Sequence, residues 1–444
     1  MTSHSLHFNL LAQAYATFAA VVALATTLPP SLQAENILIK GATIHTVSGA
    51  TLSPGQIWMK DGKIQAVGES IVAPDATVSD LTGQHLYPGL IAASTILGLT
   101  EIGAIRATQD MREVGKFNPD VRSWIAMNPD SELIPVARAN GITHMVPTPQ
   151  GGLVTGQSGL VALDGWTMEL MVAKKSIALH VEWPEMNLDT TPKELFRDKT
   201  KWKSPEDLAK ERRKELSQLD SFFQDAAAYT RARDHNAETR LQPAWETMRP
   251  VLRGDIPVVV HADDLRAIHA AVQWARTNQL RLIISGGRDA LLAAPLLASN
   301  QVPVIFEHVF TRPVRDTDSY DYFFHAPAAL QEAGVTVALS AGTGEMSETE
   351  VRNLPYHAAQ AVAYGMRREE ALKTITLNPA KMFGVADRLG SIEKGKEATL
   401  IATDGDLLDI RSHVKLMWIA GQPVSLETRH TRLYEKYRRR PSPR

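Results

Sequence analysis

The chain has 444 residues, a length that suits two or three domains or one large α/β barrel with additions. Lys plus Arg number 47 against 49 for Asp plus Glu, a formal net charge of -2, so no global field favours nucleic acid or an anionic membrane as a partner. We therefore expect a small-molecule substrate and no nucleic acid. Cysteine is absent, which excludes disulfides, thiolate metal sites and a cysteine nucleophile.

Residues 1–34 have the composition of a secretory signal peptide. Phe8 to Leu28 is uncharged and rich in Ala, Leu and Val, Pro29 and Pro30 end any helix, and Ala34 offers a small residue for cleavage. A retained anchor is the alternative, because the apolar run approaches the length that spans a bilayer. We expect export to the periplasm or beyond, with no membrane span after signal removal.

Short strand-like runs occur at both ends of the remaining chain. They are residues 36–44, 56–68, 398–403 and 414–421. Asp61 and Gly62 divide the run at 56–68 into two strand-like halves, which is a strong hairpin signal. We predict that 35–87 and 385–426 meet in one small β-sandwich. The basic tail, 427–444, is interpreted as a docked or mobile C-terminus.

Between these ends, residues 88–384 alternate strand-like apolar runs with helical stretches. This alternation predicts a parallel sheet, and at this length a (β/α)8 barrel. Seven strands are predicted: 89–96, 142–147, 176–182, 258–261, 282–285, 302–306 and 335–340. The eighth has no clear position. The glycine-rich segment from Gly151 to Gly159 is interpreted as a loop, either structural or able to hold a substrate carboxylate with its N–H groups.

A charged segment, Lys193 to Arg233, interrupts this alternation. Ser204 and Pro205 are typical of a helix start, and Leu216, Leu219 and Phe223 follow at helical spacing. We predict a surface helix with one apolar face.

Several motifs resemble the amidohydrolase superfamily. Tyr87 to Leu99, which reads Tyr-Pro-Gly-Leu-Ile-Ala-Ala-Ser-Thr-Ile-Leu-Gly-Leu, resembles the segment that opens its catalytic barrel. Later segments resemble the closing helices of its imidazolonepropionase-like branch, namely 353–359, 363–365, 370–372, 374–380 and 389–398. The resemblance covers nearly the whole chain after residue 34.

The resemblance implies a metal-assisted hydrolase, in which one or two divalent ions activate a water that attacks a C–N bond. The family takes its ligands from a His-x-His pair on the first strand, a carboxylate or carboxylated lysine on the fourth, histidines on the fifth and sixth, and an aspartate on the eighth. Here Ser94 and Ile96 replace the first pair, and Ala92 stands where the family usually has Asp. The sixth-strand histidine and the eighth-strand aspartate have no clear counterparts.

Three residues remain as candidate metal ligands. His261 ends the fifth-strand motif, and Glu182 is the fourth-strand candidate. His180 lies two residues before Glu182 and therefore on the same face of its strand. We predict a reduced site of His261, His180 and Glu182 for one divalent ion (Zn, Mn, Fe or Ni), or no metal. The alternative is structural: a hydrogen-bonded histidine and a solvated glutamate.

Two further groups are candidates for catalysis and binding. Asp263 and Asp264 follow His261 and, with Glu182, are predicted to act as acids or bases. The sequence Gly286-Gly287-Arg288 is predicted to bind an anionic group of the substrate, because glycines permit close backbone approach. A tight turn explains the same glycines.

These observations favour a hydrolase acting on a C–N bond of a small molecule or short peptide, with a homo-oligomer as an option. The alternative is a non-catalytic periplasmic binding or interaction protein that keeps the barrel. Metal-free acid-base chemistry by Glu182, or by Asp263 and Asp264, is a third hypothesis.

Overall fold

The computed structural model describes residues 36–187, 189–236 and 238–440. The predicted signal peptide and its cleavage point lie outside these residues. Within them, no helix combines the length and the apolar character needed to cross a membrane.

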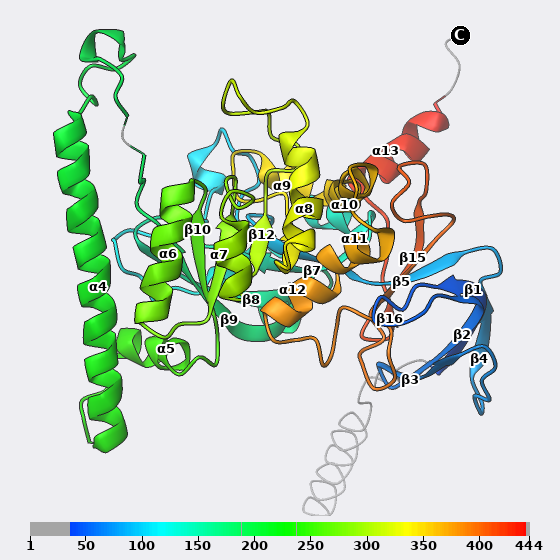
Figure 1. The fold of residues 1–444 in the computed structure, drawn as a ribbon. Helices are drawn as coiled ribbons and strands as arrows, with labels where there is room; N and C mark the ends of the chain where they lie inside the picture. Colours follow the sequence, from blue (N-terminus) through cyan, green and yellow to red (C-terminus); the bar gives the residue numbers. More distant parts are fainter. Residues whose placement is uncertain (1–35, 188, 237, 441–444) are drawn as a thin grey trace, which may run out of the picture.

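Eight strands form a nearly closed barrel at the centre of the molecule (Figure 1). They are β6 (Leu90–Thr95), β7 (Ile142–Pro147), β8 (Val154–Ala162), β9 (Val172–Glu182), β10 (Val258–Ala262), β11 (Leu282–Gly286), β12 (Val304–Phe306) and β13 (Val337–Leu339). Neighbours follow chain order, and all of the pairs are parallel except those that β8 makes with β7 and β9. The Ser340 hydroxyl donates to the Ser94 carbonyl at 2.6 Å and so connects the two ends of the sheet.

The seven predicted barrel strands are all present, and β8 is the eighth. The interpretation of Gly151 to Gly159 as a loop is therefore wrong from Val154 onward. Its glycines serve packing: a Cβ at Gly159 would lie 3.0 Å from the Trp124 ring, and one at Gly156 would lie 2.9 Å from the Val121 carbonyl. The connection after β6 packs closely on β8 at these points.

Alternate strand residues fill the barrel interior, and the others pack against the surrounding helices. The interior cluster contains Ile91, Ala93, Val146, Leu160, Ile177, Ala178, Val259, Ile283, Ile305 and Ala338, with Ala380, Met382, Phe383, Val385 and Leu389 from the chain after β13. The barrel is thus a packed core, and polar side chains are expected only near its ends.

The helices are α2 (Leu133–Arg138), α3 (Met168–Met171), α4 (Pro205–His235), α5 (Pro243–Leu252), α6 (Leu265–Thr277), α7 (Ala294–Ser299), α8 (Tyr322–Glu332), α9 (Ser347–Glu350), α10 (Leu354–Ala363), α11 (Arg368–Thr374), α12 (Leu377–Met382) and α13 (Arg429–Arg438), with short 3-10 turns at Arg106–Thr108, Ser123–Ile125, Lys193–Leu195 and Val351–Asn353.

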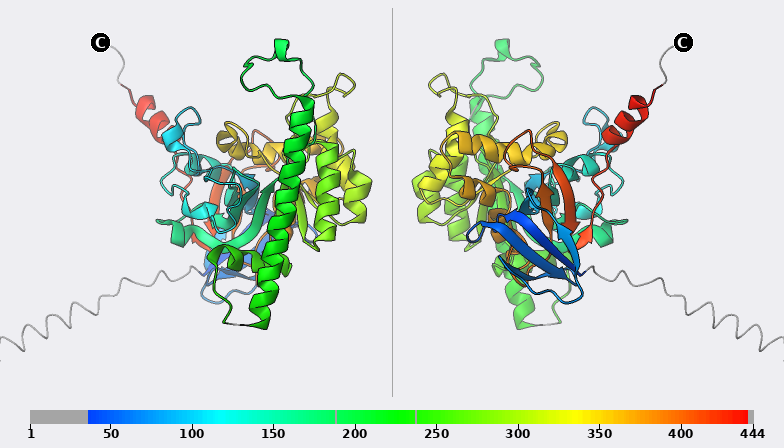
Figure 2. Two further views of the ribbon diagram at one scale, coloured as in Figure 1. Left: turned by 90° about the vertical axis from the view of Figure 1, so that its left-hand side faces the viewer. Right: turned by 90° about the vertical axis from the view of Figure 1, so that its right-hand side faces the viewer.

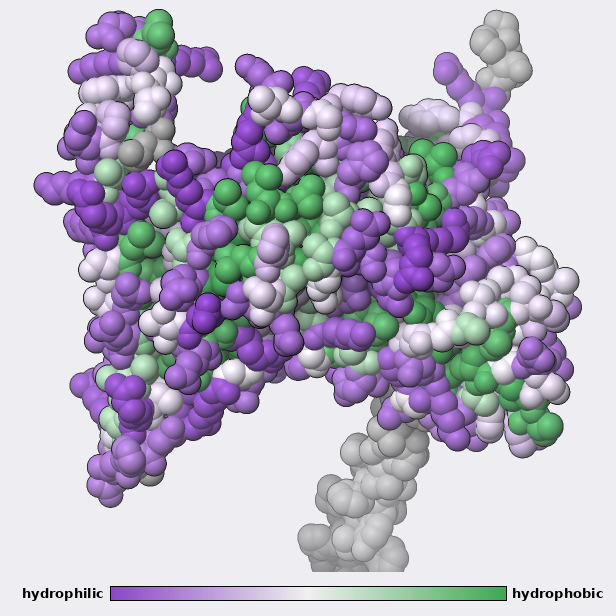
Figure 3. Space-filling view, viewed as in Figure 1, coloured by the Kyte–Doolittle hydropathy of each residue, from purple (hydrophilic) through white to green (hydrophobic). Residues whose placement is uncertain are grey.

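The long helix α4 lies along one side of the barrel (Figures 1 and 2). Ser204 caps it by accepting from the Asp207 N–H, and Pro205 occupies the first turn, as predicted. Leu219 and Phe223 are buried, and Phe223 packs edge-on against Trp274 of α6. Its outer surface is mostly hydrophilic (Figure 3). The predicted surface helix with one apolar face is confirmed.

Both chain ends contribute to a second sheet beside the barrel. It contains β1 (Ile37–Ile44), β2 (Leu52–Lys60), β3 (Lys63–Gly68), β4 (Thr77–Asp80), β5 (His85–Pro88), β14 (Leu400–Thr403), β15 (Val414–Ile419) and β16 (Gln422–Pro423). The hairpin at Asp61 and Gly62 joins β2 and β3, and β14 pairs antiparallel with β5. The sandwich form of this assembly stays a prediction. In the basic tail, Thr428 caps α13.

Candidate active site at the barrel mouth

Polar side chains line the end of the barrel where the parallel strands terminate, which we call the barrel mouth. Val259, Ile283 and Ile305 belong to the interior cluster. Because strand side chains alternate, the residues two positions further along share the inner face. These residues are His261, Ser285 and Glu307. The strand pattern therefore replaces the apolar core with a polar layer at the mouth.

Two histidines and a serine form a hydrogen-bonded chain in this layer. Nδ1 of His180 lies 3.0 Å from Nε2 of His261, and Nε2 of His180 lies 2.8 Å from Oγ of Ser158. Burial, and then the proximity of His261, hold the pKa of His180 far below its usual value. His180 is therefore neutral near pH 7 and can exchange a proton only through its two partners. His261 is partly exposed and is the member of the chain open to the mouth.

Glu182 lies beside this chain. It is the register partner of His261 between β9 and β10, and its side chain is partly exposed. Its backbone N–H donates to the Leu153 carbonyl at 3.0 Å. The structure thus brings His180, His261 and Glu182 to neighbouring strand positions.

A second chain links the ends of β10 and β12. Oδ1 of Asp263 lies 2.7 Å from Nε2 of His308, and Nδ1 of His308 lies 3.1 Å from the Thr311 hydroxyl. Burial raises the pKa of Asp263, but the hydrogen bond and charge of His308, with the N–H of Arg288, outweigh it and hold that pKa below its usual value. Asp263 is therefore an ionised carboxylate that orients His308.

The glycine turn after β11 holds Asp263. The Arg288 N–H donates to Oδ1 of Asp263 at 3.2 Å, and a Cβ at Gly286 would lie 2.6 Å from the same oxygen. Gly286 and Gly287 both have positive φ, at 89° and 69°. The anion at this turn is therefore the chain's own Asp263. The prediction that Gly286, Gly287 and Arg288 bind substrate stays a prediction.

Asp264 has a different role from its neighbour. Its carboxylate accepts from the N–H groups of Arg266 and Ala267, each at 3.0 Å, and caps α6. Only 6% of Asp264 is exposed. Of the two predicted aspartates, Asp263 contacts the polar groups of the mouth, whereas Asp264 caps α6.

Sequence reasoning missed Ser158, Glu307 and His308. Oε1 of Glu307 accepts from the Ser285 hydroxyl at 2.7 Å, and a Cβ at Gly342 would lie 2.5 Å from its other oxygen. The signal was available, because Glu307 and His308 directly follow the predicted strand at 302–306. Ser158 was hidden by the interpretation of its segment as a loop.

The connection after β6 covers part of the mouth. Residue bridges join Phe117 to Val154 and Arg122 to Gln157. The Gln150 side chain accepts from Arg112 at 3.2 Å and donates to the Thr343 carbonyl at 2.7 Å. These hydrogen bonds join the connections that follow β6, β7 and β13.

The donor groups at the mouth do not fit the metal centre implied by the sequence resemblance. Among the described residues, no group of three or more His, Asp or Glu side chains converges well enough to hold a metal ion. Both nitrogens of His180 already have partners, and Nε2 of His261 faces His180. At the first-strand positions, Ser94 and Ile96 are buried, with 1% and 2% of their surfaces exposed.

Comparisons with known proteins support one superfamily. The model of the amidohydrolase family matches residues 318–426. A solved amidohydrolase from Thermotoga maritima is 27% identical, with a TM-score of 0.75, and the match covers 88% of this chain and 99% of that one.

Curated relatives give the same indication. The amidohydrolase tasK of Hapsidospora irregularis is 24% identical over 413 residues, and an imidazolonepropionase of Brucella suis is 27% identical over 150 residues. These matches cover 85% and 34% of this chain, but 40% and 36% of the relatives' own lengths. The chain is thus similar to amidohydrolases in fold and sequence, whereas the imidazolonepropionase-like branch stays a prediction.

Proposed function

We propose that this protein is a hydrolase that cleaves a C–N bond of a small molecule or short peptide at the barrel mouth. The observation that carries the proposal is the chain from Ser158 through His180 to His261, which places an imidazole at the open end of the barrel with a buried proton relay behind it. The similarity to amidohydrolases supports the same reaction class.

In the proposed reaction, His261 accepts a proton from the water that attacks the carbonyl carbon. This step needs the tautomer in which Nε2–H of His261 donates to Nδ1 of the neutral His180, because it leaves Nδ1 of His261 free to accept the proton, and Nε2–H of His180 then donates to Ser158. Asp263 holds Nε2–H of His308, so Nδ1–H of His308 donates the proton that the leaving nitrogen requires when the C–N bond breaks, after the Thr311 hydroxyl turns away from Nδ1. Glu182, beside His261, stabilises the imidazolium that forms.

A reduced metal site is the second form of this proposal. One divalent ion would be held by His261, His180 and Glu182, and would supply Lewis-acid activation of water. This arrangement requires the 3.0 Å hydrogen bond between His180 and His261 to open.

The test uses the full chain with a panel of N-acyl amino acids, dipeptides and cyclic amides. We expect turnover that falls at least about 100-fold in His261→Ala, in line with the loss of a general base. The control His269→Ala changes an exposed histidine of α6 and should leave turnover unchanged. Turnover equal in His261→Ala and wild type would contradict the proposal.

Metal content distinguishes the two forms. Protein purified after growth with Zn, Mn, Fe or Ni is measured for bound metal, and turnover is then compared before and after chelation. Full turnover in metal-free protein supports the acid-base form. Stoichiometric metal that is lost in His180→Ala, together with turnover, supports the reduced site.

A non-catalytic binding protein is the alternative function. The side chains at the mouth favour it, since no group of three or more His, Asp or Glu side chains among the described residues could hold the metal ion that the resembled family uses. Saturable binding of panel compounds without hydrolysis would support this alternative. We propose export to the periplasm or beyond for either function.

A further inference from the structure

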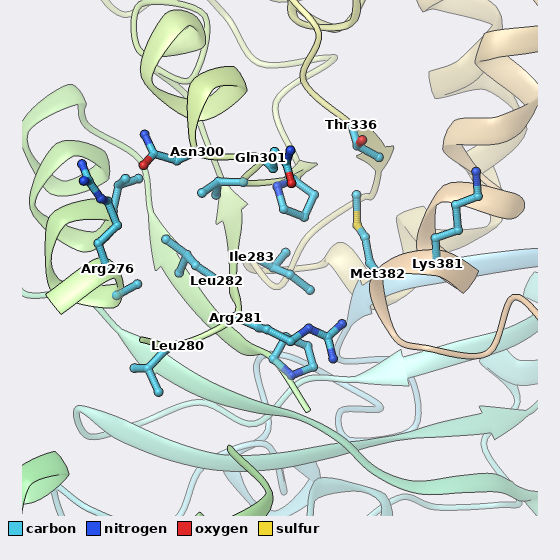
Figure 4. Close-up of a pocket in the computed structure, with 15 residues that line it drawn as sticks. Arg276, Leu280, Arg281, Leu282, Ile283, Asn300, Gln301, Thr336, Lys381 and Met382 are labelled. Atoms are coloured by element: carbon cyan, nitrogen blue, oxygen red, sulfur yellow. The ribbon is translucent and has the colours of Figure 1, made fainter. Parts of the chain in front are cut away.

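A cavity of about 500 Å³ lies at the end of the barrel opposite the mouth (Figure 4). Pro257, Leu282, Pro303 and Thr336 line it, and each lies at or just before the start of a barrel strand. His261 lies near the opposite, C-terminal end of β10, three residues after the first residue of the strand, Val258. The cavity is therefore separate from the proposed active site, and its volume is in the range of small-molecule sites.

Among the residues that the structure describes, three cationic side chains and no carboxylate line this cavity. Arg276 comes from the last turn of α6, Arg281 directly precedes β11, and Lys381 comes from α12. Figure 4 shows the three on different sides of the opening. Arg281 donates to the carbonyls of Gly254 and Asp255 at 3.1 and 3.2 Å. Within the described chain, Arg276 and Lys381 form no ion pair.

The interior of the cavity is apolar. Val272 and Ala275 come from α6, Ile283 from β11, Val302 from the segment before β12, and Met382 from α12. Ile283 and Met382 also belong to the interior cluster of the barrel, so the cavity reaches the packed core. Asn300 and Gln301 add amide groups at the rim. Cations at the edge and hydrocarbon within match a ligand that has one charged end.

We propose that this cavity binds a small organic anion, a carboxylate or phosphate group attached to an apolar body. The anionic group lies among Arg276, Arg281 and Lys381, and the body contacts Val272, Ile283 and Met382. Arg276 and Lys381 have no carboxylate partner among the described residues, so an anion at the edge of the cavity can form charge-assisted hydrogen bonds with them. Two of the three cations also lie near helix C-termini, but Arg281 is on no helix, so helix dipoles alone do not account for the set.

Calorimetric titration of the full chain at low salt tests the proposal. The probes are hexanoate, hexyl phosphate, neutral hexan-1-ol and inorganic phosphate. We expect saturable binding of hexanoate, hexyl phosphate or both, at least tenfold tighter than hexan-1-ol and inorganic phosphate, because both the charge and the body contribute. A preference between the two hexyl anions identifies the acidic group.

Substitutions locate the site. Arg276→Gln combined with Lys381→Gln should weaken hexyl-anion binding at least tenfold, and both side chains are exposed, so folding should be retained. The matched control, Arg266→Gln, changes an exposed arginine at the opposite end of α6 and should bind as the wild type does. His261→Ala should also bind normally, which separates this result from the hydrolase proposal.

Four results would overturn the inference: no saturable binding to the wild type, equal affinity for hexan-1-ol, unchanged affinity in the double variant, or loss of binding in His261→Ala.

Discussion

His357 of α10 is a buried histidine whose environment opposes protonation. Only 6% of the residue is exposed, Nδ1 has no hydrogen-bond partner within the described residues, and the ring packs edge-on against Phe310. Burial lowers the pKa of His357 to about 4 from an ordinary value of 6.5. Burial likewise lowers the pKa of His144 to about 3 and that of His45 to about 4.

These lowered pKa values predict acid sensitivity. Below pH 6.5 the unfolded chain takes up protons at these histidines, whereas in the folded chain His357 stays neutral until about pH 4. The free energy of unfolding therefore decreases as the pH is lowered from 6.5 to 4. For His357 alone the loss amounts to about 3 kcal/mol. His357→Leu should therefore give a shallower decline in the free energy of unfolding between pH 6.5 and 4, measured by urea denaturation. The exposed His269→Leu should keep the wild-type slope, and an identical slope in both variants would contradict the assignment.

For single residues, the sequence predicted which side chains lie at the site better than it predicted their hydrogen-bond partners. His180 and His261 could be found because strand alternation places a histidine on an inner face. Glu307 and His308 could not be related to Ser285 and Asp263, because those contacts depend on how β12 sits beside β11 and on the turn at Gly286. Local spacing contains no information on such neighbours.

At the scale of elements, apolar runs predicted seven barrel strands, and the eighth was hidden by its glycines. Gly156 and Gly159 lower the strand propensity of β8, but they are needed where Val121 and Trp124 approach. A glycine-rich strand can be distinguished from a loop only when the chain that packs on it is known.

The turn after β11 also requires a glycine, at Gly286, and this requirement can be tested. In Gly286→Ala, the new Cβ would meet Oδ1 of Asp263 at 2.6 Å, and alanine would adopt a φ of 89°. We expect a loss of about 1–3 kcal/mol in the free energy of unfolding. The displaced Asp263 should also release His308, which lowers turnover and changes its pH profile.

Gly344→Ala is the matched control. Gly344 also lies in a connection at the barrel mouth, and a Cβ added there would meet no atom within 4 Å. This variant should keep wild-type stability and turnover. Equal effects of the two substitutions would mean that the contact with Asp263 is unimportant.

At the scale of the whole molecule, the two ends of the chain are predicted by sequence to meet, and β14 does pair with β5. The similar strand character of the two ends was sufficient for that inference. The order of strands in the sheet was not available from sequence, because β14 lies between β5 and β15 rather than at an edge.

Truncation tests the importance of this pairing. A chain ending at Gly395 lacks β14, β15 and β16, which leaves the buried residues of β5 without cover. We expect it to be insoluble or rapidly digested in limited proteolysis. A chain ending at Thr428 lacks only α13 and the residues after it, and α13 has no buried residues, so this control should be soluble and resistant. Soluble, protease-resistant protein from the shorter chain would contradict the expectation.

The pairing of β5 with β14 also sets a limit on when the protein can fold. Leu400 pairs with Pro88, so the partners are about 300 residues apart, and the ribosome needs roughly 15–60 s to synthesise the chain between them. During that time the edge of β5 is open to other chains. The first sheet to begin is therefore among the last to be completed.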